Sequence, residues 1–177
     1  GLAEAFIITE KFIGTSNTTL ILGDNLFYGE SFAKLLKKKF HSGARIFCSK
    51  VNDPERYGVL EIQGDQPISI VEKPEKFISP WAVTGIYTYD SSVIERAKLL
   101  KPSKRGEIEI TELNQGFLDD TILDCEFFDQ NVVWMDTGTF ESMKEASEFI
   151  AAIQKRQGTL VGSPELAAYK NQWVTES

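Results

Sequence analysis

Length, composition and charge limit what this sequence can encode. With 177 residues and 42% hydrophobic side chains, the chain is long enough to form one domain with a substantial core. Its 26 acidic and 19 basic side chains give a net charge of −7, which argues against binding to polynucleotides or to anionic membranes.

The hydrophobic periodicity predicts alternating helices and strands. A helix is expected at about 2–12, a strand at 18–22 and a helix at 31–40, followed by strands at 44–51, 57–62, 67–73 and 83–89. Helices are then predicted at 91–100 and 109–119, strands at 121–128 and 132–135, and helices at 139–156 and 164–171. This order predicts an α/β fold with a mixed, mostly parallel sheet, antiparallel strands at 57–73, and a single domain over 1–177.

The cysteines and the ends of the chain carry further expectations. Cys48 and Cys125 lie on strand-like segments without metal-ligand spacing, so reduced structural thiols are expected. No segment approaches the roughly 18 apolar residues that cross a bilayer, and a cytoplasmic protein is expected. Helical spacing from the first residues, without a methionine or an N-cap, indicates that the chain is a fragment of a longer protein.

Two aspartates follow apolar strand-like runs and are candidate ligands for a cation. Asp24 ends the run LILGD, and Asp136 ends VVWMD before a long helix that Thr137 or Thr139 would cap. Taken singly, each is better explained by a turn, a surface turn at Asp24 and a helix-entry turn at Asp136. As a pair they would suit one divalent cation, and a small set of hard oxygen ligands favours Mg²⁺.

A third candidate is the stretch IVEKP. Glu72 can accept hydrogen bonds from two hydroxyl groups of a polyol, and Lys73 is a compact cation suited to a phosphate. The alternative is an exposed strand edge that stops at Pro74. Gly58 would let a ligand approach the backbone closely, or would mark a bulge.

Charged residues also precede the predicted helix at 109–119. Arg105, Glu107 and Glu109 are explained by capping and by salt bridges, and no ligand is assigned to them.

Eight stretches, taken in order, resemble the glucose-1-phosphate thymidylyltransferase family of sugar nucleotidyltransferases. They are GLAEAF, LILGDNLFYG, VNDPERYGVLE, ISIVEKP, AVTGIYTYD, KPSKRGEIEITELN, WMDTGT and EASEFIAAIQKRQG, and they span nearly the whole chain. The resemblance implies a Rossmann-like nucleotidyltransferase sheet flanked by helices, with an antiparallel sugar-binding insertion.

The resemblance also implies roles for single residues. The residues that match the family's magnesium-binding aspartates are Asp24 and Asp136, and Asp24 also meets the nucleotide. Those that match sugar-binding positions are Gly58, Glu72, Val83, Asn25 and Tyr87, with Lys73 beside the sugar phosphate. Gly1 matches a nucleotide-binding glycine, and a regulatory nucleotide-sugar site would include Tyr28, Gly29 and Arg156.

The implied reaction joins dTTP and glucose 1-phosphate, with release of diphosphate, in the first step of dTDP-rhamnose synthesis. The sugar phosphate would attack the α-phosphorus in line, so positioning and electrostatics would carry the catalysis. The resemblance further implies dTDP-sugar as product or inhibitor and a homotetramer.

The chain departs from the family in specific places. The family's glycine-rich phosphate loop and its base-reading glutamine precede the matched region, so these 177 residues alone are expected to be inactive. Phe140 replaces a usual histidine, and Glu30-Ser31 replaces a usual His-Asp pair. Two alternatives stay open: transfer of a uridylyl, cytidylyl or adenylyl group, and a non-catalytic nucleotide-sugar-binding protein.

Overall fold

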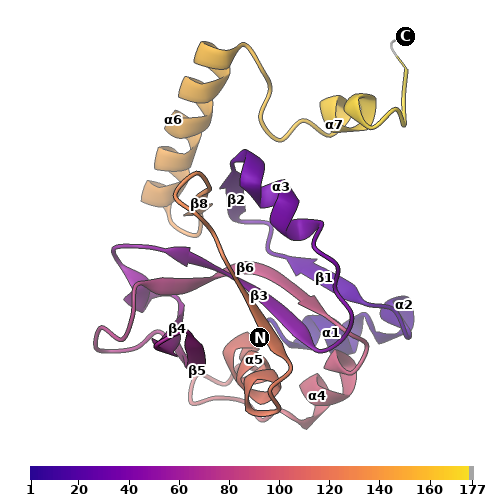
Figure 1. Ribbon diagram of the computed structural model, residues 1–177, viewed down its shortest axis with the longest axis vertical. Coiled ribbons are helices and arrows are strands. Elements are labelled where there is room, and N and C mark those ends of the chain that lie inside the picture. The colour runs from indigo at the N-terminus through magenta and orange to yellow at the C-terminus, as the bar shows by residue number, and fades with distance from the viewer. Residues whose placement is uncertain (176–177) are drawn as a thin grey trace. The chain divides into compact units, whose positions relative to one another are not determined.

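The computed structural model describes residues 1–175 of the chain (Figure 1). The chain divides into two compact units, Gly1–Trp134 and Met135–Ser177. The expectation of one domain over the whole chain stays a prediction.

The first unit contains most of the secondary structure. Its helices are α1 (Glu4–Ile8), α2 (Glu10–Ile13), α3 (Glu30–Leu36), α4 (Val93–Leu99), α5 (Ile110–Asp119) and the 3-10 turn η1 (Pro54–Arg56). Its strands are β1 (Thr18–Ile21), β2 (Asn25–Tyr28), β3 (Ala44–Lys50), β4 (Gly58–Gln63), β5 (Gln66–Glu72), β6 (Trp81–Tyr89) and β7 (Leu123–Phe127). Strand β8 (Val133–Asp136) spans the boundary, and the second unit contains α6 (Phe140–Gln157) and α7 (Pro164–Lys170).

A mixed six-stranded sheet forms the centre of the first unit. Its order is β5-β4-β6-β3-β7, and β1 also pairs with β6. Strand β3 runs parallel to β7, whereas β1, β3 and β4 each pair antiparallel with β6. The predicted mixed sheet is confirmed. Antiparallel pairs make up a larger part of it than we expected from the apolar run of β1, which is typical of a parallel sheet. Strand β1 alternates between half-buried and exposed residues, which is typical of a strand with one covered face.

The predicted hairpin at 57–73 is confirmed. Strands β4 and β5 are antiparallel, and their register places Gly58 opposite Glu72 at the open end of the hairpin.

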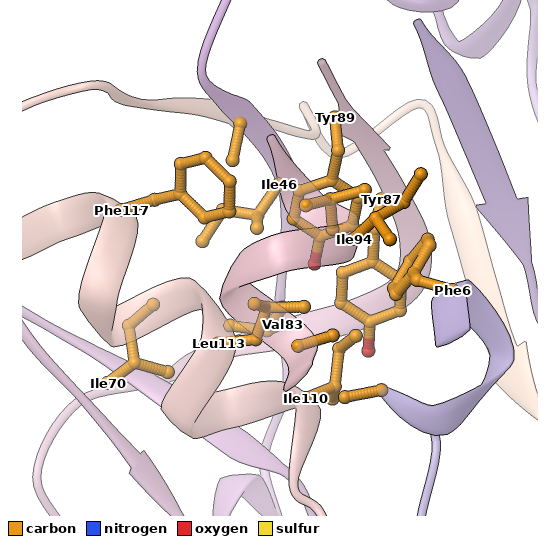
Figure 2. Close-up of a cluster of buried hydrophobic side chains, with 14 of the residues drawn as sticks. Phe6, Ile46, Ile70, Val83, Tyr87, Tyr89, Ile94, Ile110, Leu113 and Phe117 are labelled. Carbon is orange, nitrogen blue, oxygen red and sulfur yellow. The ribbon is translucent and has the colours of Figure 1, made fainter. Parts of the chain in front are cut away.

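The two faces of the sheet carry different apolar clusters because side chains alternate along a strand. On one face, Ile46 and Tyr87 pack with residues of α1, α4 and α5. Figure 2 shows this cluster, with Phe6 and Phe117 approaching the tyrosines of β6 from different helices. On the other face, Phe47 and Ile86 pack with Phe128 and with aromatic residues of β2 and α3.

Two helix predictions needed correction at their ends, and an open choice of cap is decided. The helix expected at 2–12 is interrupted at Thr9, whose hydroxyl donates to the Ala5 carbonyl oxygen at 2.6 Å and competes with continued helix formation. The helix expected at 31–40 already ends at Leu36. In the second unit, Thr139 and not Thr137 caps α6, through a capping box with Ser142.

The cysteines are free thiols, as predicted, with Cys48 buried and Cys125 partly buried. Over residues 1–175 no helix combines the length and the apolar character that crossing a bilayer requires.

Candidate functional site

Strand β6 brings the segment that contains Asp24 toward the predicted sugar-binding residues. Val83, Gly85 and Tyr87 alternate along one face of β6. Strand β1 pairs with β6 so that Leu20 lies opposite Tyr87. Just beyond β1, the Leu22 amide donates to the Gly85 carbonyl oxygen at 2.9 Å. Asp24 follows in the exposed turn between β1 and β2, so it lies close to the middle of β6.

Three of the predicted sugar-binding residues meet at one point. A methyl group added to Gly58 would lie 3.4 Å from Glu72 Oε2 and 3.9 Å from Val83 Cβ. The same methyl group would lie 3.1 Å from Thr111 Oγ1, in α5. The structure therefore brings Gly58, Glu72 and Val83 together, and a larger residue at position 58 would fill the space between them.

The hydroxyl group of Tyr87 is influenced by the charges of Glu72 and of Asp24. Burial raises the pKa of its hydroxyl, and the negative charges of Glu72 and Asp24 act in the same direction. Both carboxylates are therefore within electrostatic reach of the Tyr87 hydroxyl. Asp24 and Glu72, which are far apart in the sequence, are brought to the same region of the first unit.

Asn25 is directed toward the sheet. Its Oδ1 accepts a hydrogen bond from the Gly85 amide at 3.0 Å, and its Nδ2 donates to Asp24 Oδ1 at 2.8 Å. The predicted contact between Asn25 and a sugar stays a prediction.

Lys73 stands at the end of β5 in an unusual backbone conformation. Its φ is +44°, a left-handed value that side-chain-bearing residues rarely adopt, and Pro74 follows it. Its amide donates to the Tyr57 carbonyl oxygen at 2.9 Å, which ties this strained residue to the segment before β4. The Lys73 side chain is exposed, so its ammonium is available to an anion.

Asp136 ends β8 and lies in the second unit. Its Oδ1 accepts a hydrogen bond from the Gly138 amide at 3.0 Å, so the predicted helix-entry turn is present. Among residues 1–175, no three His, Cys, Asp or Glu side chains form a cluster able to hold a metal. The expectation that Asp24 and Asp136 share one cation stays a prediction.

The remaining predicted residues lie elsewhere. Gly1 packs on the segment before α5, where an added methyl group would lie 2.3 Å from the Ile108 carbonyl oxygen. Tyr28 ends β2, and Gly29 occupies the N-cap position of α3 with a φ of +145°. Arg156 is exposed in the last turn of α6, in the second unit. The nucleotide role of Gly1 and the regulatory roles of the other three stay predictions.

The sequence interpretation missed two partners of Glu72. Thr111 Oγ1 donates to Glu72 Oε2 at 2.6 Å, and Arg105 NH1 lies 3.6 Å from Glu72 Oε1. Arg105 also forms the predicted ion pairs with Glu107 and Glu109, at 3.7 and 3.8 Å. The capping prediction was wrong, because Glu109 occupies the N-cap position of α5 but makes no side-chain capping bond.

A pocket of about 450 Å³ lies beside these partners. Its lining includes Glu72, Ser103, Arg105, Thr111 and Gln115. The lining combines three carboxylates, two cations (Lys104 and Arg105) and the hydroxyl groups of Ser103 and Thr111. Carboxylates and hydroxyl groups can bind the hydroxyl groups of a sugar, and the cations can bind an anionic group. Its cations and its hydroxyl groups come from the stretch KPSKRGEIEIT, so the crowding of charge in that stretch was a usable signal.

Comparison with known proteins identifies the family. The sequence model of the family described as nucleotidyl transferase matches residues 1–153. The chain is 47% identical over 180 residues to glucose-1-phosphate thymidylyltransferase of Neisseria gonorrhoeae, an alignment that covers 99% of this chain and 62% of the relative. It is 46% identical to the Xanthomonas campestris protein of the same name, covering 98% of this chain and 60% of the relative.

Solved structures agree in fold. A crystal structure described as a putative glucose-1-phosphate thymidylyltransferase from Bacillus anthracis in complex with a sucrose superposes with a TM-score of 0.74 and 39% identity. That match covers 84% of this chain and 60% of the other chain. A UDP-glucose pyrophosphorylase complexed with UDP-glucose has the same TM-score, 0.74, with 25% identity, and covers 88% of this chain and 62% of the other.

The chain thus spans about three fifths of the length of the curated relatives that it matches. The family match extends over most of the chain and includes Asp24, Glu72, Lys73 and Asp136. The predicted Rossmann-like nucleotidyltransferase fold is confirmed by the structural neighbours. The chain therefore belongs to the nucleotidyl transferase family.

Proposed function

We propose that this chain forms the sugar-phosphate half of a glucose-1-phosphate thymidylyltransferase, which joins dTTP and glucose 1-phosphate and releases diphosphate. The observation that carries the proposal is the meeting of Gly58, Glu72 and Val83 beside β6, with a pocket of mixed charge next to Glu72. The named relatives with 46–47% identity support the same reaction.

The arrangement favours recognition of a sugar through Glu72. Its carboxylate accepts a hydrogen bond from Thr111 and faces Arg105, so these contacts fix its orientation before a ligand arrives. Two carboxylate oxygens can accept hydrogen bonds from neighbouring hydroxyl groups of one sugar ring. The absence of a side chain at Gly58 keeps the Glu72 carboxylate uncrowded, because an added methyl group would lie 3.4 Å from Glu72 Oε2.

Cationic side chains would bind the sugar phosphate. Lys73 follows Glu72 directly, and its exposed ammonium can pair with a phosphate oxygen. Arg105 lines the pocket next to the Glu72 carboxylate and can bind the same phosphate through two parallel hydrogen bonds. The two cations would reduce the repulsion between the two anionic substrates, which is the main electrostatic barrier to the reaction.

Asp24 and Asp136 would hold Mg²⁺. Both are carboxylates at the ends of strand-like runs, and hard oxygen donors in small number fit a cation that also binds phosphate oxygens and water. When bound, the ion would offset charge on the α-phosphate and on the leaving diphosphate. The chain's own contribution is to keep the Asp24 carboxylate next to β6, where the sugar phosphate would lie.

A second candidate is transfer of a uridylyl group. The similarity to a UDP-glucose pyrophosphorylase bound to UDP-glucose, with a TM-score of 0.74, favours it over the cytidylyl and adenylyl alternatives. The relatives at 46–47% identity, all named as thymidylyltransferases, favour dTTP over UTP.

The test is a substrate panel on the gene's full-length product. Glucose 1-phosphate is offered with dTTP, UTP, CTP or ATP in the presence of Mg²⁺, and diphosphate release is measured. The proposal expects the largest kcat/KM with dTTP. A largest value with UTP would select the second candidate, and binding without diphosphate release from any nucleotide would overturn both and leave the non-catalytic alternative.

A further inference from the structure

The side chain of Asn25 is held by two donors. Its Oδ1 accepts hydrogen bonds from the Gly85 amide at 3.0 Å and from Trp134 Nε1 at 2.6 Å. An amide oxygen has two lone pairs, so both are used. The amide cannot be turned over without placing two N–H donors against its own NH₂ group, which fixes the direction of that NH₂ group.

The fixed NH₂ group is directed at a candidate catalytic carboxylate. Asn25 Nδ2 donates to Asp24 Oδ1 at 2.8 Å. Asp24 itself lies in an exposed turn between β1 and β2. The hydrogen bond from Asn25 links this exposed carboxylate to the buried strand β6.

Trp134 and Gly85 are both fitted to this arrangement. The Trp134 ring packs against Tyr57 with a centroid distance of 4.9 Å, which holds the indole N–H in place. At Gly85, an added methyl group would lie 2.6 Å from Asn25 Oδ1 and 2.7 Å from Nδ2. Residue 85 must therefore lack a side chain for Asn25 to reach the sheet.

We propose that Trp134 is a positioning residue that acts through Asn25 to orient the Asp24 carboxylate. This inference rests on the proposed function, in which Asp24 acts at the reacting phosphates. Without the indole N–H, Asn25 Oδ1 keeps one donor, and its amide can rotate away from Asp24. The Asp24 carboxylate then loses one of the hydrogen bonds that orient it, which slows the chemical step more than it weakens sugar binding.

The main variant is Trp134→Phe in the full-length protein, which removes the N–H donor and keeps an aromatic ring against Tyr57. The matched control is Trp81→Phe, because the Trp81 ring packs on Phe127 at 4.8 Å, outside the site. The NMR signals of the Asn25 side-chain amide are followed in both variants, together with kcat and with KM for glucose 1-phosphate.

The proposal expects Trp134→Phe to shift the Asn25 amide signals and to speed their exchange with water. It expects kcat to fall about tenfold, the effect of one lost hydrogen bond, with KM changed less than about threefold. Trp81→Phe is expected to match the parent in every readout. Unchanged Asn25 signals in Trp134→Phe, or a parental kcat, would overturn the proposal.

A second variant covers the case in which Trp134→Phe does not fold. Asn25→Asp keeps two oxygens for the donors of Gly85 and Trp134 but replaces the NH₂ donor, so it is expected to retain the Trp134 indole signal and lose kcat about tenfold. A parental kcat in Asn25→Asp would overturn the proposal. If the parent releases no diphosphate, the proposed function fails, and the NMR comparison alone decides whether Trp134 orients Asn25.

Discussion

Replacement of Gly58 by alanine tests the candidate sugar site most simply. The backbone at this position does not need glycine, because Gly58 is absent from the positive-φ glycines of residues 1–175. The effect of the added methyl group should therefore come from its contacts. It would lie 3.1 Å from Thr111 Oγ1 and 3.4 Å from Glu72 Oε2, the two atoms that the hydrogen bond between these residues joins.

The magnitude follows from that hydrogen bond. A hydrogen bond to a charged group contributes about 1.5–3 kcal/mol, and a forced separation of Thr111 from Glu72 would lose a large part of it. The reduced flexibility of the unfolded chain offsets about 0.4–1 kcal/mol. We therefore expect Gly58→Ala to lower the free energy of unfolding by about 1–2 kcal/mol, from the difference between these two contributions. We expect the KM for glucose 1-phosphate to rise about tenfold, which corresponds to roughly 1.4 kcal/mol of binding.

The assay measures thermal unfolding and diphosphate release in the full-length protein. Gly116→Ala is the matched control, because it makes the same change inside α5, where the nearest neighbour of the new methyl group outside the helix backbone would be Arg96 NH1 at 3.9 Å. Alanine is the better helix former, so this control should gain about 0.5–1 kcal/mol and keep the parental KM. If Gly58→Ala also gains stability and keeps the parental KM, the site does not have the geometry described.

Other predictions concern pH and thiol chemistry. Burial is the main reason why the pKa of Tyr87 is raised above 10.0. Above about pH 10 the unfolded state loses the hydroxyl proton and the native state keeps it, so stability should fall as the pH rises. Tyr87→Phe should make this fall less steep when stability is measured by urea titration. Burial also raises the pKa of Cys48, and it raises the pKa of Cys125 to about 12. Both thiols should therefore react with a disulfide reagent at pH 8 at least about tenfold faster in the unfolded protein than in the native protein. Equal rates in the two states would contradict the burial of the thiols. Burial alone would raise the pKa of Asp90, but hydrogen bonds from Ser92 and from the Gly43 amide outweigh it and lower the pKa below 3.8. The contribution of Asp90 to stability should therefore be lost as the pH falls through that range, and Asp90→Asn should weaken the acid dependence.

The local parts of the site could be predicted from the sequence. The four-residue link between β4 and β5 predicts a hairpin, and an antiparallel hairpin places Gly58 opposite Glu72. The start of α7 is equally local, because Ser163 caps the helix and Pro164 takes its first position.

Long-range contacts could not be predicted in the same way. Asn25 meets Gly85 because β1 pairs with β6 in a particular antiparallel register, and alternation of apolar residues does not specify which strands pair. The rule that ligands gather at the carboxyl ends of parallel strands pointed to Asp24, but an antiparallel pair brings it to β6.

The positive φ of Lys73 also had no sequence signal, because a lysine before a proline predicts an extended backbone. The hydrogen bond from the Lys73 amide to the Tyr57 carbonyl oxygen and the neighbouring strands stabilise this strained conformation. Trp134 was overlooked because its partner, Asn25, lies 109 positions away in the sequence.

The most direct test of the central claim is diphosphate release from dTTP and glucose 1-phosphate by Asp24→Asn in the full-length protein. The matched control is Asp65→Asn, in the exposed turn of the β4–β5 hairpin. A carboxylate that acts at the reacting phosphates predicts a loss of kcat of at least about a hundredfold in Asp24→Asn, and parental turnover in Asp65→Asn. Parental turnover in Asp24→Asn would contradict the assignment of the catalytic site to this side of β6.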